Sequence, residues 1–118
     1  MTDTYVLYHN PRCSKSRAAL ALLDARGITP RVVRYLDTPP DVATLQSLVA
    51  QLGLTPRALL RTGEPEYAAL GLDDPGVDDA AILDAMATHP RLIERPILVR
   101  GTRAVIGRPT ERLLTLLD

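Results

Sequence analysis

Residues 5–17 read YVLYHNPRCSKSR, and this stretch determines the fold expected for the first half of the chain. Its first part, Tyr5–Tyr8, is rich in β-forming residues and predicts a short buried strand. His9–Pro11 is typical of a turn, and the residues after Cys13 have the apolar spacing of a helix that ends near Gly27. The lone cysteine, Cys13, therefore lies where a strand meets the start of a helix.

The remaining sequence extends this β–loop–α pattern into a single α/β domain over residues 1–118. Arg31–Leu36 alternates with β-branched residues and predicts a second strand, which a right-handed crossover makes parallel to the first. Ile97–Arg100 and Arg103–Ile106 have a strong β-hairpin signal, and a final helix follows them. We expect a mixed four-stranded sheet with flanking helices, in which a helical insert, roughly residues 41–90, separates a βαβ half from a ββα half.

Within the insert, Asp41 is a candidate helix cap, and the pair Asp78-Asp79 opens a second helix. Asp41 and Asp78 each precede apolar residues at helical spacing. Arg57–Leu60 indicates a further short helix, and the Gly-, Pro- and Asp-rich residues 62–78 indicate a surface-exposed helical segment.

Composition excludes several classes of protein. The 118 residues are 46% apolar, enough for one compact domain without disulfide or metal support. The 14 basic and 14 acidic residues balance, which excludes a duplex-DNA binder that works by neutralising phosphates. The longest apolar stretch, Ala18–Leu23, is far short of the roughly 20 residues that span a bilayer, and the N-terminus lacks a signal-peptide pattern. We expect a cytoplasmic protein with neither nucleic-acid nor membrane partners.

Cys13 is a candidate nucleophile because a helix N-terminus favours an anion. A free thiol has a pKa of about 8.5, and lowering it to about 6 needs roughly 3 kcal/mol. The helix dipole contributes only about 0.3–1 kcal/mol, so nearby cations must supply the rest. The nearest candidates in sequence are His9, Arg12, Lys15 and Arg17. The alternative is that Cys13 is simply a small buried apolar residue.

The cysteine count constrains any redox cycle. Cys13–Ser16 is a C-x-x-S sequence without a second thiol, and the chain has no other cysteine. An oxidised intermediate therefore needs an external thiol to resolve it. A single cysteine also argues against a cysteine-based zinc site, and we expect no bound metal.

Two arginines are expected beside the cysteine. Arg95 precedes the first hairpin strand and Arg108 follows the second, so both lie at one end of the hairpin. If Ile97–Arg100 runs antiparallel to Tyr5–Tyr8, Cys13 lies at that end too. Two guanidinium groups and a helix N-terminus around a thiol suit a small tetrahedral oxyanion. The arginines expected to be solvated surface charges are Arg31, Arg34, Arg57, Arg91 and Arg112.

These residues match a known family. The sequence HNPRCSKSR at residues 9–17, with Leu60-Arg61, Glu94–Ile97 and Gly107–Pro109, resembles the thioredoxin-like arsenate reductases linked to glutathione and glutaredoxin. The resemblance covers almost the whole chain in order and spacing, and it implies a thioredoxin-like fold. Ser14-Lys15, where family members more often carry Gly-Thr, resembles the Cys-Ser-Lys-Ser-Arg form of an arsenate-reductase-like subgroup.

The resemblance also implies roles for individual residues. Cys13 would attack arsenate, and His9 would help to keep it ionised. Three arginines would bind the oxyanion: Arg61, Arg95 and Arg108. Supporting positions would be Ser16, Arg17 and Pro96, the last after a cis peptide bond.

The activity that the resemblance implies is reduction of arsenate to arsenite, with no bound cofactor, glutathione as co-substrate and glutaredoxin as partner protein. Two alternatives stay open at this point. One is a redox-linked transcriptional regulator that binds RNA polymerase, although Ser16 replaces the second cysteine usual in that branch and all three arginines are retained. The other is a monothiol glutaredoxin-like thiol transferase, in which the arginines would bind a carboxylate of glutathione.

Overall fold

The computed structural model describes residues 4–117, which form two compact units. The first unit comprises the residues up to Thr38 and those from Arg95 onward, and the second is Pro39–Glu94. The elements of the first unit are β1 (Tyr5–His9), α1 (Ser14–Ala25), β2 (Arg31–Arg34), β3 (Ile97–Arg100), β4 (Arg103–Ile106) and the 3-10 helix η2 (Thr110–Leu116). The elements of the second are α2 (Val42–Leu52), α3 (Pro56–Leu59), α4 (Pro65–Ala69), α5 (Asp79–Thr88) and the 3-10 helix η1 (Pro90–Leu92). None of the helices in the described part of the chain is long and apolar enough to cross a membrane.

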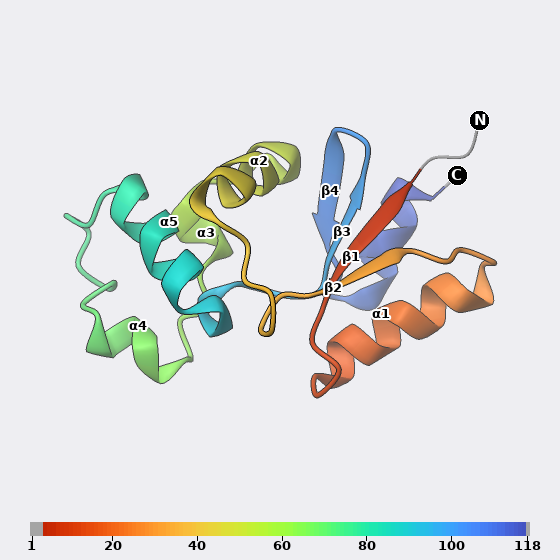
Figure 1. Ribbon diagram of the computed structural model, residues 1–118, viewed down its shortest axis with the longest axis horizontal. Coiled ribbons are helices and arrows are strands. Elements are labelled where there is room, and N and C mark those ends of the chain that lie inside the picture. Colours follow the sequence, from red (N-terminus) through yellow and green to blue (C-terminus); the bar gives the residue numbers. More distant parts are fainter. Residues whose placement is uncertain (1–3, 118) are drawn as a thin grey trace. The chain divides into compact units, whose positions relative to one another are not determined.

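The first unit contains a four-stranded mixed sheet in the order β2-β1-β3-β4 (Figure 1). β1 pairs in parallel with β2, with His9 opposite Arg34, and antiparallel with β3, with Tyr8 opposite Ile97. β3 and β4 form the antiparallel hairpin. The predicted mixed sheet is therefore confirmed, as is the helical segment between its two halves.

One face of this sheet is covered by α1 and η2. Leu7 of β1 lies opposite Leu98 of β3, and both are fully buried. They pack in one cluster with side chains of α1, among them Leu23, and with Leu113 and Leu116 of η2. Because this cluster holds α1 against β1, the start of α1 is fixed beside the end of β1.

The helical unit has its own buried core and well-defined helix caps. Its buried side chains include Leu45 of α2 and Ile82 of α5. Asp41 Oδ1 accepts a hydrogen bond from the backbone N–H of Thr44 (2.8 Å), and Asp78 Oδ1 accepts one from Ala81 (2.9 Å). Both aspartates therefore begin helices as predicted, since a side-chain oxygen satisfies an N–H group that has no partner within the helix.

Three element boundaries differ from the sequence prediction. β1 continues through His9, which was expected in the turn. β2 ends at Arg34 rather than Leu36, because the carbonyl of Arg34 accepts hydrogen bonds from the N–H groups of Asp37 (3.0 Å) and Thr38 (2.9 Å) and turns the chain. The short helix expected at Arg57–Leu60 begins one residue earlier, at Pro56, where Thr55 caps it.

Arg57 was expected to be a solvated surface charge, and that prediction is wrong. Its guanidinium donates to three backbone carbonyls, those of Leu72 (2.8 Å), Asp74 (3.1 Å) and Val77 (3.1 Å). Arg57 therefore holds the loop between α4 and α5 against the start of α3. The planar guanidinium suits this role because it presents several donors in a fixed arrangement.

Truncation of Leu98 tests the core that positions α1. We expect Leu98→Ala to lower the free energy of unfolding by about 2–5 kcal/mol, because it removes buried methyl groups and leaves a cavity between the sheet and α1. The matched control is Val32→Ala on the edge strand β2, where the side chain is 41% exposed. Denaturant titration followed by circular dichroism measures both. Equal losses would show that the Leu7–Leu98 layer is not the core of this unit.

Candidate active site

Cys13 occupies the N-cap position of α1, in an extended backbone conformation. Its N–H donates to the carbonyl of Asn10 (2.9 Å) and its own carbonyl accepts from the N–H of Arg17 (3.0 Å). The Asn10 side chain in turn accepts from the N–H of Arg12 (3.0 Å). These bonds fix the loop between β1 and α1, so the thiol is held where the first N–H groups of the helix have no backbone partner.

The pKa of Cys13 is lowered by its surroundings. Burial, the largest single influence, raises the pKa, since the side chain is only 8% exposed. Hydrogen bonding from the backbone N–H groups of Ser16 and Lys15 and the positive charge of Arg95 act in the opposite direction and together prevail. The buried Ser16 hydroxyl makes the smallest contribution, since its Oγ has no hydrogen bond of ordinary geometry within residues 4–117.

The cation that stabilises the thiolate is therefore not one of those adjacent in sequence. Arg95, far along the chain, supplies the charge, whereas Lys15 acts through its backbone N–H. Arg17 has a different role, because its Nη1 donates to the carbonyl of Pro11 (3.0 Å) and ties the loop to α1. Arg17 thus supports the loop that presents Cys13.

His9 lies at the end of β1 and is 6% exposed. Loss of solvation lowers its pKa most, the charges of Arg34 and Arg17 lower it further, and only the backbone of Ser16 raises it. The pKa of the imidazole therefore lies below its ordinary value, which disfavours the positive charge that made His9 one of the candidate cations. Its Nδ1 has no hydrogen-bond partner among the described residues. The role of His9 in keeping Cys13 ionised stays a prediction.

Arg95 and Arg108 lie at the same end of the sheet, as the hairpin geometry predicts. Ile97 pairs with Ile106, so the residues before β3 and after β4 are neighbours, and Arg108 Nε donates to the carbonyl of Arg95 (2.7 Å). Tyr8 pairs with Ile97, so β1 also ends there. Cys13 and Arg95 are thus brought together by the sheet, although they are far apart in sequence.

Gly107 allows the close approach between the two arginine-bearing segments. Its N–H donates to the carbonyl of Pro96 (2.9 Å). A Cβ at this position would lie 3.1 Å from both the Pro96 ring and a methyl group of Leu113. The peptide bond between Arg95 and Pro96 is cis, as the family resemblance implies, and the Arg108–Pro109 bond is cis as well.

Arg61, the third expected anion-binding residue, belongs to the helical unit. Its backbone N–H donates to the carbonyl of Leu92 (2.8 Å). Its guanidinium pairs with the carboxylates of Glu64 (Nη1 to Oε2, 3.0 Å) and Glu94 (Nε to Oε1, 3.7 Å). Its oxyanion-binding role stays a prediction, and the two acidic partners were not foreseen, although the three-residue spacing of Arg61 and Glu64 was a visible signal.

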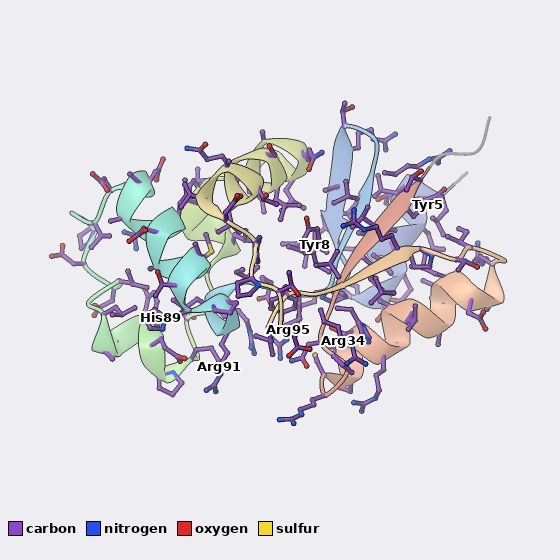
Figure 2. All side chains as sticks on the ribbon, viewed as in Figure 1. Tyr5, Tyr8, Arg34, His89, Arg91 and Arg95 are labelled. Carbon is purple, nitrogen blue, oxygen red and sulfur yellow. The ribbon has the colours of Figure 1, made fainter. Side chains whose placement is uncertain are left out.

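Arg34 is exposed, as predicted for a surface charge, but its place beside His9 was not foreseen. It ends β2 directly opposite His9 in the parallel register, and its charge lowers the pKa of that imidazole. Figure 2 labels Arg34 and Arg95. Arg34 ends β2 and Arg95 precedes β3, and these two strands pair with β1 on either side. The available signal was its position as the last residue of a strand parallel to the one that ends in His9.

Fold and site together define a class of protein. A βαβ half and a ββα half form one mixed sheet, a cysteine of lowered pKa begins the first helix, and a cis proline precedes the third strand. These are the features of a thioredoxin-like protein. The ArsC family model matches residues 8–116, so the chain belongs to the ArsC family.

Known relatives agree with this assignment. The chain is 50% identical over 112 residues to an arsenate reductase of Neisseria meningitidis, covering 94% of this chain and 96% of that protein. It is 41% identical to an arsenate reductase of Escherichia coli, covering 94% of this chain and 79% of that protein. Among solved structures, the arsenate reductase from Vibrio cholerae superposes with a TM-score of 0.96 at 49% identity, covering 99% of this chain and all of the other.

The lowered pKa of Cys13 predicts its reactivity as a function of pH. Because the pKa of Cys13 is lowered, its thiolate persists to a lower pH than the thiolate of an ordinary cysteine and is lost as the pH falls through that pKa. The rate of iodoacetamide alkylation should therefore reach half its plateau below the ordinary value of about 8.5. Arg95→Gln should raise this midpoint, because it removes the charge that favours the anion.

The matched control for that measurement is Arg31→Gln, at the opposite end of the sheet, which should leave the midpoint unchanged. A midpoint at or above about 8.5 in the unaltered protein would show that burial outweighs the donors around the sulfur.

Proposed function

We propose that this protein is an arsenate reductase, a thiol-dependent oxidoreductase in which Cys13 is the nucleophile. The observation that carries the proposal is the cysteine of lowered pKa at a helix N-terminus, with the positively charged Arg95 beside it. A thiolate and a cation at one point suit attack on a small anionic substrate. Relatives that are named arsenate reductases support the choice of arsenate.

In the proposed reaction, the Cys13 thiolate attacks arsenic and hydroxide leaves, which forms a Cys13–arsenic(V) ester. Arg95 and Arg108, with Arg61 as the third cation, would neutralise the oxyanion and orient it toward the sulfur. The backbone N–H groups of Ser16 and Lys15 stabilise the thiolate before attack and again when it leaves.

Electron balance requires two thiols for each arsenate. Arsenic gains two electrons as it passes from oxidation state V to III, and two thiols supply them as they join into a disulfide. The overall products are therefore arsenite, one disulfide and one molecule of water. Because Cys13 is the only cysteine of the chain, the disulfide that accumulates must be formed from thiols supplied from outside. Glutathione is the proposed first thiol, and glutaredoxin is the proposed protein that resolves the mixed disulfide.

A thiol transferase is the second candidate function, because the lowered pKa of Cys13 serves that reaction equally well. Such an enzyme would reduce small mixed disulfides with glutathione and would leave arsenate unchanged. The two functions therefore differ in the oxidised substrate that is consumed.

Arsenite production tests the proposed function directly. Purified protein with arsenate, glutathione and glutaredoxin should form arsenite over many turnovers, whereas Cys13→Ser should form none. Without glutathione, the protein should complete at most one chemical event for each Cys13, since it holds no second thiol. Sustained turnover without any added thiol would contradict the mechanism.

Lysine substitutions separate the anion site from the surface. Arg95→Lys and Arg108→Lys keep the charge but lose the planar pair of donors, and each charge-assisted bond contributes about 1.5–3 kcal/mol. We therefore expect kcat/KM for arsenate to fall by roughly 10- to 150-fold in each variant. Steady-state arsenite assays measure the effect, with folding checked by circular dichroism.

The matched controls are Arg31→Lys and Arg112→Lys, both at exposed positions, which should change kcat/KM by less than about twofold. Equal, small effects at all four positions would show that Arg95 and Arg108 do not bind the anion.

A further inference from the structure

A cavity of about 280 Å³ lies in the first unit beside the loop that presents Cys13. Its lining includes His9, Arg12, Arg34 and Asp37. The cavity exists because β1 and β2 are parallel and in register, with His9 opposite Arg34, so the loops that follow the two strands lie next to each other. Arg12 is the residue before Cys13, so the cavity adjoins the loop that presents the nucleophile, although Cys13 itself is not part of the lining.

Hydrogen bonds donated by backbone N–H groups hold both walls of the cavity in place. On one side, the Asn10 carbonyl accepts from the N–H of Cys13 (2.9 Å) and the Asn10 side chain from the N–H of Arg12 (3.0 Å). On the other, the Arg34 carbonyl accepts from the N–H of Asp37 (3.0 Å). The charged residues on the two walls therefore start from fixed backbone positions.

The cavity presents two cations and one anion without internal pairing. Within residues 4–117, no ion pair joins Arg12, Arg34 or Asp37 to another side chain. His9, also in the lining, is more than nine-tenths buried, and its Nδ1 has no hydrogen-bond partner in the described part of the chain. That nitrogen is itself closed off from solvent, so recognition of a ligand falls to the three exposed charged side chains.

We infer that this cavity binds the external thiol co-substrate, a small thiol peptide of the glutathione class, which carries an α-amino-acid ammonium and carboxylate at one end and a second carboxylate at the other. Arg12 and Arg34 match the two carboxylates, and Asp37 matches the ammonium. The inference rests on the proposed function, which requires an external thiol, and it assigns that thiol a place distinct from Arg95 and Arg108.

In the inferred step, the peptide bound here attacks the arsenic that Cys13 carries. Its sulfur would replace one arsenic-bound hydroxyl, so that an arsenic–sulfur bond forms, an arsenic–oxygen bond breaks, and the thiol proton leaves with the hydroxyl as water. Arsenic remains at oxidation state V in this step. In this arrangement, Arg95 and Arg108 bind the oxyanion, and the cavity on the other side of the Cys13 loop binds the thiol peptide.

Binding is tested without turnover. S-methylglutathione has the charges of glutathione and no reactive thiol, so calorimetric titration into the Cys13→Ser protein measures recognition alone. We expect Arg34→Gln and Asp37→Asn each to weaken binding by about tenfold or more, because each removes one charge-assisted contact. Arg31→Gln, at the other end of the same strand, is the matched control and should bind as the parent protein does.

Kinetics with two different thiols provides the second measurement. The KM for glutathione should rise by about tenfold or more in Arg34→Gln and Asp37→Asn, while the rate with 2-mercaptoethanol, which has no charged groups, should change by less than about twofold. The KM for arsenate at saturating glutathione should likewise be unaltered. A merely structural role of Arg34 would affect both thiols equally.

The results separate this inference from the proposed function. If arsenate is reduced but the glutathione KM and S-methylglutathione binding are the same in all variants, the cavity assignment is wrong. If S-methylglutathione binds in a manner that depends on Arg34 and Asp37 but arsenate is not reduced, the thiol site stands and the proposed substrate is wrong. No detectable binding of S-methylglutathione to the Cys13→Ser protein also overturns the inference.

Discussion

The antiparallel pairing of β1 with β3 is the constraint on which the site depends. With Tyr8 opposite Ile97, the end of β1 and the beginning of β3 meet at one end of the sheet. Cys13 follows the first strand and Arg95 precedes the third, so this pairing brings a thiol and a cation together. A shift of one residue in the register would turn Leu7 and Leu98 away from α1, and the core would then be lost together with the site.

The pKa of Cys13 is set by a balance between burial of the sulfur and the hydrogen-bond donors around it. Removing the sulfur from water disfavours its anion, and this effect is larger than any single stabilising one. The thiolate is favoured only because two backbone N–H groups at the start of α1 act together with the Arg95 charge. A helix N-terminus alone, worth about 0.3–1 kcal/mol, is too weak, which is why the sheet must also bring in a distant arginine.

Local patterns allowed most of the fold to be predicted. The strand–turn–helix stretch of residues 5–17, the hairpin around Gly101 and the caps Asp41 and Asp78 each depend on residues close together in sequence. The placement of Arg95 and Arg108 also followed from hairpin geometry, since strand direction determines which ends meet.

Properties that depend on long-range contacts could not be predicted in this way. Arg57 bonds to carbonyls 15 to 20 residues later, and such side-chain-to-backbone contacts leave no periodic signal. The lowered pKa of His9 arises from its burial and from Arg34 on a neighbouring strand. The acidic partners of Arg61 include Glu94, which is distant in sequence.

The central claim, that the surroundings of Cys13 lower its pKa, is tested most directly by ¹³C NMR of protein labelled at the cysteine Cβ. One cysteine gives one signal, whose chemical shift reports ionisation without any reagent. The account predicts a single inflection below the ordinary thiol value of about 8.5. An inflection at or above that value would mean that burial outweighs the donors around the sulfur and would contradict the account.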